Sequence, residues 1–200
     1  KYKESQDEKS ILRSIKILCC DPENITNRKD LKTGKMRADA TNLARDLGNT
    51  PANDLKPKDL ASTAKNIAKQ HKMNCTVLEE KQMKKLGMDM LLGVSRGSRE
   101  PAKLILMEYF HQKAKQTVAL VGKGVTFDSG GISLKPAKFM EDMTYDMAGS
   151  AVVVGLMKNL ALRKAKINAV GVVGLVENMP GGNAQRPGDI VKSYSGKTIE

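Results

Sequence analysis

Apolar positions along the chain alternate between helical and strand-like patterns. They recur every three or four residues over 30–48 and 58–70, which predicts two helices, and an apolar run of small residues from Ala148 to Leu162 predicts a third. A shorter helix is expected over residues 81–86, and strands over residues 75–78, 90–94, 103–109, 117–121 and 167–176. Helices that alternate with apolar strands predict an α/β fold, a three-layer sandwich with a mixed, largely parallel central sheet.

Polar, turn-forming segments separate these elements. Residues 21–28 (DPENITNR) predict a boundary or linker, and residues 49–57 contain two prolines and predict a loop. The valine-rich run over 167–176 is typical of a strand that is buried on both faces. The pattern over residues 1–20 fits an amphipathic helix or an extended segment, and both interpretations stay open.

The amino-acid composition limits the kinds of function that the chain can be expected to have. The 200 residues carry 34 Lys and Arg against 22 Asp and Glu, a formal charge of +12. Because the basic residues are spread at helical spacing, a solvated surface is favoured over a surface for nucleic acid or anionic membrane. Cys19, Cys20 and Cys75 form no CxxC pair and suit a reducing compartment. No apolar run is long enough to span a membrane.

The candidate chemistry lies in residues 121–136, VGKGVTFDSGGISLKP. Lys123 follows a predicted strand, Asp128 lies in the predicted turn, and Asp146 precedes the third helix. In open α/β sheets, ligands gather beyond the carboxyl ends of strands, so these charges are candidates for a site. Surface ion pairs around the turn are an alternative, and so is a helix-capping role for Asp146. Phosphate binding is weakly supported, because neither glycine-rich phosphate-binding pattern is present.

Together with MEDMTYDMAGSA (140–151) and ENMPGGNAQRPGD (177–189), this stretch resembles the leucyl aminopeptidases, or cytosol aminopeptidases. ARDLGNTPAND and LLGVSRGSREP extend the resemblance upstream, in family order, from Arg45 to Lys197. The resemblance implies a two-metal exopeptidase. Lys123, Asp128 and Asp146 match metal ligands, with Asp128 bridging the ions and Lys123 bound as the neutral amine. Lys135 matches the charged catalytic lysine.

Met143 matches a position in the pocket for the first side chain of the substrate, and an ordinary core position is the alternative. With Met143, the four charged residues above would also contact the substrate. The resemblance implies two divalent ions per subunit, zinc or manganese, with magnesium or cobalt possible. It further implies a bicarbonate in the complete protein, peptide substrates with leucine or another apolar first residue, a homohexamer, and a cytoplasmic location. Neither a membrane partner nor a nucleic-acid partner is expected.

The family pattern places further metal ligands beyond Glu200, so we expect a fragment of a longer chain. Residues 1–29 would end an amino-terminal α/β domain, residues 30–48 would form a linking helix, and residues 49–200 would begin the catalytic domain. Alone, the 200 residues are expected to be inactive and poorly stable, because the sheet is unfinished and the metal cluster incomplete. The alternatives are a non-catalytic family homologue and a basic nucleic-acid-binding protein.

Overall fold

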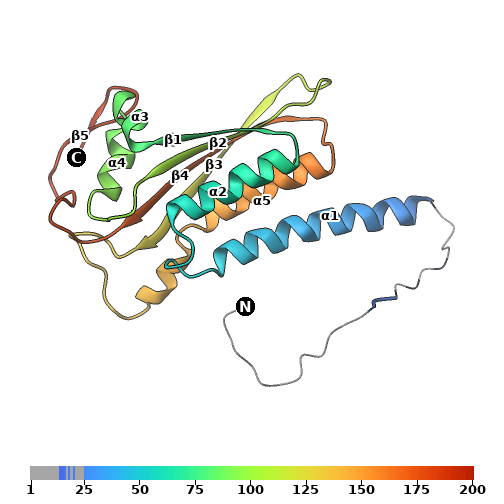
Figure 1. Ribbon diagram of the computed structural model, residues 1–200, viewed down its shortest axis with the longest axis horizontal. Coiled ribbons are helices and arrows are strands. Elements are labelled where there is room, and N and C mark those ends of the chain that lie inside the picture. Colours follow the sequence, from blue (N-terminus) through green and yellow to red (C-terminus); the bar gives the residue numbers. More distant parts are fainter. Residues whose placement is uncertain (1–13, 17, 19, 21–24) are drawn as a thin grey trace.

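A computed structural model describes residues 14–16, 18, 20 and 25–200 (Figure 1). Its elements, in chain order, are α1 (Ile25–Gly48), α2 (Pro57–Gln70), β1 (Asn74–Glu79), α3 (Glu80–Lys85), α4 (Asp89–Ser95), β2 (Lys103–Tyr109), β3 (Thr117–Asp128), the 3₁₀ helix η1 (Met140–Tyr145), α5 (Ala148–Leu162), β4 (Asn168–Asn178), β5 (Val191–Lys192) and β6 (Thr198–Ile199). The described residues before α1 form no helix or strand, and the rest of the 1–20 segment lies outside the described residues.

Four strands form the main sheet in the order β1-β2-β4-β3. Strands β3 and β4 are parallel, while β2 is antiparallel to both β1 and β4. The predicted α/β fold with a mixed sheet is confirmed, but "largely parallel" is wrong for these pairings. Within the four-stranded sheet, β3 is joined to β4 by a crossover through α5, and a crossover of this kind lets neighbouring strands run in the same direction.

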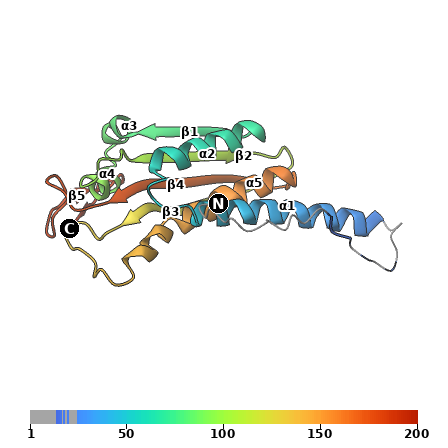
Figure 2. The ribbon, with the colours of Figure 1, turned by 60° about the horizontal axis from the view of Figure 1, so that its bottom comes forward.

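Helices cover both faces of the sheet. An added Cβ at Gly171 of β4 would meet Met157 and Val153 of α5, whereas one at Gly174 would meet Leu91 of α4. Strand side chains alternate between faces, so α5 and α4 lie on opposite sides of β4. Helix α2 packs beside α5, and α1 lies along α5 in both views (Figures 1 and 2).

The main core lies between the sheet and the α2–α5 face. Its fully buried side chains are aliphatic or Met, among them Leu60, Ile105, Met107, Val154, Met157 and Val173. A second core, around Met83, Ala102 and Val176, lies under α3 and α4. In the described part of the chain, no helix is both long and apolar enough to cross a membrane.

One predicted strand, residues 90–94, is wrong, since those residues belong to helix α4. A five-residue apolar run does not distinguish a strand from a buried helix. In the structure, Leu91 and Leu92 pack against the second core, and the Leu92 amide donates to the Met88 carbonyl at 3.3 Å. The predicted boundary over residues 21–28 is also too long at its end, because α1 begins at Ile25.

Strand β3 extends seven residues beyond its predicted end at Val121. The glycines that suggested a turn serve close packing instead. A Cβ at Gly122 would lie 2.7 Å from the Gly149 carbonyl oxygen of α5, and one at Gly124 would lie 2.5 Å from the Gly174 carbonyl oxygen. Lys123 therefore lies within the strand rather than in the turn, and Asp128 is the last residue of the strand.

Candidate metal centre

An irregularity in β3 sets the direction of Asp128. Val125 lies opposite Val176 of β4, and Asp128 lies opposite Asn178, so three steps along β3 match two along β4. A β-bulge of this kind re-aims the side chains that follow it. In a regular strand, residues five apart face opposite sides of the sheet. The extra residue reverses that alternation, which brings Asp128 back to the face of Lys123.

The Asp128 carboxylate is partly buried, and both of its oxygens are hydrogen-bonded. Oδ1 accepts from the Gly130 amide at 2.9 Å and from Asn178 Nδ2 at 2.7 Å, while Oδ2 accepts from Lys135 Nζ at 2.8 Å. Burial is the largest influence and raises the pKa of Asp128, but these hydrogen bonds outweigh it and hold the pKa below its ordinary value. The group is therefore an anion at neutral pH, as a metal ligand must be.

Asp146 lies between η1 and α5 and pairs with Lys123. The Lys123 Nζ to Asp146 Oδ1 distance is 2.8 Å, and the side chains are 61% and 18% exposed. Asp146 Oδ2 is buried and has no hydrogen-bond partner. The capping alternative is not supported, because the residue that caps α5 is Met147, with no side-chain capping bond.

Lys135 connects the turn after β3 to η1. Its Nζ lies 2.8 Å from Asp128 Oδ2 and 3.0 Å from Met143 Sδ. Gly130 and Gly131 have φ of +92° and +69°, the left-handed region that favours glycine, and they let the chain fold back so that the Lys135 amide donates to the Ser129 carbonyl at 2.9 Å. Half-buried Met143 belongs to neither core cluster, and its predicted contact with substrate stays a prediction.

The arrangement suits part of a metal site. In the described part of the chain, no three His, Cys, Asp or Glu side chains gather in metal-binding geometry. The two carboxylates therefore need the Lys123 amine, and further ligands, to hold ions. Asp146 Oδ2 supports this assignment, because a buried carboxylate oxygen without a partner is costly unless a cation or donor satisfies it. The ion pairs alone fit the surface-pair alternative equally well.

Sequence reasoning missed one residue of this site, Asn178. It is the last residue of β4, and its amide contacts Asp128. It lies in the segment ENMPGGNAQRPGD, whose resemblance to the family pattern was the available signal. A role could not be assigned from that pattern, because the pairing of β3 with β4 was needed to place Asn178 beside Asp128.

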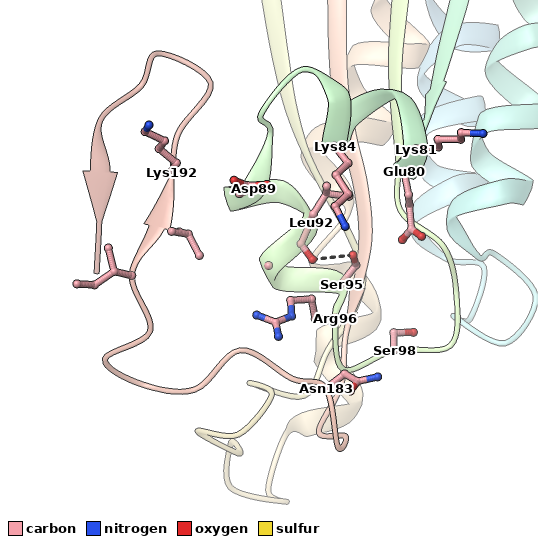
Figure 3. Close-up of a pocket in the computed structure, with 13 residues that line it drawn as sticks. Glu80, Lys81, Lys84, Asp89, Leu92, Ser95, Arg96, Ser98, Asn183 and Lys192 are labelled. Atoms are coloured by element: carbon pink, nitrogen blue, oxygen red, sulfur yellow. Dashed lines mark hydrogen bonds between the residues drawn. The ribbon is translucent and has the colours of Figure 1, made fainter.

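A larger hollow lies elsewhere. The basic cleft, which we define by Lys81, Lys84, Arg96 and Lys192, has a volume of about 840 Å³, with Arg96 and Lys192 on opposite walls (Figure 3). A hollow of about 310 Å³ lies beside the turn after β3, lined in part by Gly130, Gly131 and Asn178. The basic cleft contains none of the predicted metal ligands. The candidate site is therefore located by the carboxylates of Asp128 and Asp146, each paired with a lysine, and not by the size of a cavity.

Fold and site together define an α/β protein with a candidate metal centre at the carboxyl ends of its parallel strands. Residues 42–200 match the catalytic domain of the cytosol aminopeptidase family. The chain belongs to the cytosol aminopeptidase family.

Relatives agree with this assignment. The chain is 54% identical to a probable cytosol aminopeptidase of Chelativorans sp. (strain BNC1) and 51% identical to one of Brucella suis biovar 1 (strain 1330); both alignments cover the whole chain. It spans only 41% and 40% of those relatives' lengths. A solved structure, the bottromycin maturation enzyme BotP in complex with Mn, matches with a TM-score of 0.84 and 40% identity, over 88% of this chain and 38% of that one.

Proposed function

We propose that this chain is part of a metal-dependent aminopeptidase that removes amino-terminal residues from peptides, with leucine and other apolar first residues preferred. The observation that carries the proposal is the buried Asp146 Oδ2, which has no hydrogen-bond partner beside the Lys123–Asp146 ion pair. Family membership and the manganese named with BotP support it.

Lys123, Asp128 and Asp146 would hold two divalent ions. When bound, such ions act as Lewis acids and make a nucleophile from water at neutral pH. Lys123 would serve as the neutral amine, while Asp128 and Asp146 supply carboxylate oxygens. The charged Lys135 ammonium, next to the turn, would stabilise negative charge as it develops on the scissile carbonyl oxygen. Met143, in contact with Lys135, would line an apolar pocket for the first side chain.

Several properties of the whole protein belong to the same proposal. The ions are zinc or manganese, with magnesium or cobalt also compatible with oxygen ligands and one amine. Further ligands and a bicarbonate site lie outside these residues, the subunits form a homohexamer, and the protein works in the cytoplasm, as the names of its relatives suggest. The 200 residues alone are proposed to be inactive, since Asp128 and Asp146 are two carboxylates where the family pattern has more.

The test uses a chain completed to the length of its relatives, assayed for hydrolysis of leucine amide with Mn²⁺ or Zn²⁺. Activity should disappear with a chelator and return with metal, and Lys123→Ala and Asp128→Ala should each abolish it. Wild-type activity in both variants would overturn the ligand assignment. Salt-dependent DNA binding that survives the chelator, without peptidase activity, would favour the nucleic-acid alternative.

A further inference from the structure

Asn178 occupies a junction between the two parallel strands. It lies directly opposite Asp128 in the strand register, and its Nδ2 donates to Asp128 Oδ1 at 2.7 Å. Its main-chain oxygen accepts from the Ser129 amide at 3.0 Å and from Ser129 Oγ at 2.8 Å. One residue of β4 thus holds both the side chain that ends β3 and the backbone that follows it.

These contacts treat the two oxygens of Asp128 differently. Oδ1 accepts two N–H donors, from Gly130 and Asn178, which together use its in-plane lone pairs. Oδ2 accepts only from Lys135 and keeps acceptor capacity. Rotation of the carboxylate plane out of this position would break both bonds to Oδ1. The carboxylate is therefore held in one orientation, with Oδ2 toward Lys135.

The amide of Asn178 is itself restrained. Its nitrogen faces the carboxylate, because an amide oxygen in that position would oppose a negative charge. Its Oδ1 lies only 2.8 Å from where a Cβ on Gly131 would be, so the glycine leaves the space that the amide fills. A larger residue at position 131 would push the amide away from Asp128.

We propose that Asn178 is a positioning residue for the metal centre, whose amide fixes the Asp128 carboxylate so that Oδ2 is presented to a divalent ion. This inference rests on the proposed role of Asp128 as a metal ligand. Asn178 does not touch metal or substrate; it acts through Asp128. Removal of a residue that orients a metal ligand through a hydrogen bond typically weakens metal affinity about 10–100-fold.

The experiment measures the Kd for Mn²⁺ by isothermal titration calorimetry, and the melting temperature without metal, in a chain completed to its relatives' length. The variants are Asn178→Ala and Asn178→Ser, whose side chains lack the amide donor. The matched control is Asn159→Ala in α5, which removes a 3.3 Å hydrogen bond from Asn159 Nδ2 to the Met36 carbonyl, away from the site.

Both Asn178 variants should weaken Mn²⁺ binding by about 10–100-fold, whereas Asn159→Ala should lower the melting temperature and leave the Kd within about twofold of wild type. If Asn178→Ala does not fold, Asn178→Ser decides. A Kd within twofold of wild type in the folded Asn178 variants, with tight binding by wild type, overturns the positioning role alone. A wild-type chain that binds no Mn²⁺ overturns the proposed function and, with it, this inference.

Discussion

The turn after β3 and the basic cleft both carry several charges, but they hold them in different ways. At the turn, Asp128 is paired with Lys135 and fixed by two further donors. In the cleft, none of its four basic side chains has an acidic partner within ion-pair distance among the residues that the structure describes. The cleft is the larger space. Charged groups that are held in fixed positions, rather than the volume of a cleft, therefore indicate where chemistry takes place.

The largest contrast should come from removing a carboxylate. Asp128→Ala should lower kcat/KM for leucine amide at least about a thousandfold, because even one lost electrostatic partner costs about 10²–10³ in rate. Lys84→Ala, in the basic cleft, should leave kcat/KM within about twofold. Steady-state kinetics in a completed chain measure both. An equal loss of kcat/KM in the two variants would contradict the claim that the turn after β3, and not the basic cleft, carries the chemistry.

Lys135→Ala should have the next largest effect. Loss of its ammonium should lower kcat by about 10²–10³, while the Kd for Mn²⁺ should not weaken, because Lys135 occupies Asp128 Oδ2 rather than supporting it as a ligand. Lys192→Ala in the basic cleft is the control and should change neither quantity. A weakened Kd with unchanged kcat would show that Lys135 serves the metal and not the reaction.

Stability should respond more to a side chain added at Gly131, in the turn after β3, than to one added at Gly182. Gly131→Ala places a side chain at φ +69° and 2.8 Å from Asn178 Oδ1, and should destabilise the chain by about 1–2 kcal/mol for the left-handed conformation alone. Gly182→Ala has no atom within 4 Å of its new Cβ and should change stability by less than about 0.5 kcal/mol. Urea denaturation compares them, and equal midpoints would refute the argument.

The smallest effect concerns Asp189, which forms an ion pair with Arg186. Hydrogen bonds from the Arg186 amide and side chain, with a weaker contribution from Arg96, hold the pKa of Asp189 below its ordinary value of 3.8. Its stabilisation should be present above pH 3.8 and disappear as the pH falls through the lower folded-state pKa. Asp189→Asn should therefore be less stable than wild type at pH 6, with the gap closing in acid. A gap independent of pH would exclude an electrostatic origin.

Most helices and strands of the sheet follow from the pattern of apolar positions in the sequence. Helix α5 has its predicted bounds, and α2, β1, α3 and β4 differ by one or two residues from the prediction. The failures have local causes. Residues 89–95 form a helix in which Leu91 and Leu92 both pack against the second core. A short apolar run in the sequence does not reveal that contact. β3 continues past Gly122 because α5 packs against that glycine.

The sequence was enough to name the residues of the candidate site, but not to predict how they are arranged. Family resemblance singled out Lys123, Asp128, Lys135 and Asp146, and the structure pairs them as Lys123–Asp146 and Asp128–Lys135. The bulge that turns Asp128 toward the face of Lys123 could not be predicted, because it is a property of the register between β3 and β4. For the same reason the contact of Asn178 with Asp128 required the strand pairing.

The most direct test is anomalous X-ray diffraction at the manganese edge, from crystals of a completed chain grown with Mn²⁺. The predicted result is anomalous density within coordinating distance of oxygens of Asp128 and Asp146, with the Lys123 amine as a further ligand. Manganese density only at other places, such as the basic cleft, or none beside these carboxylates at a saturating concentration, would contradict the metal centre.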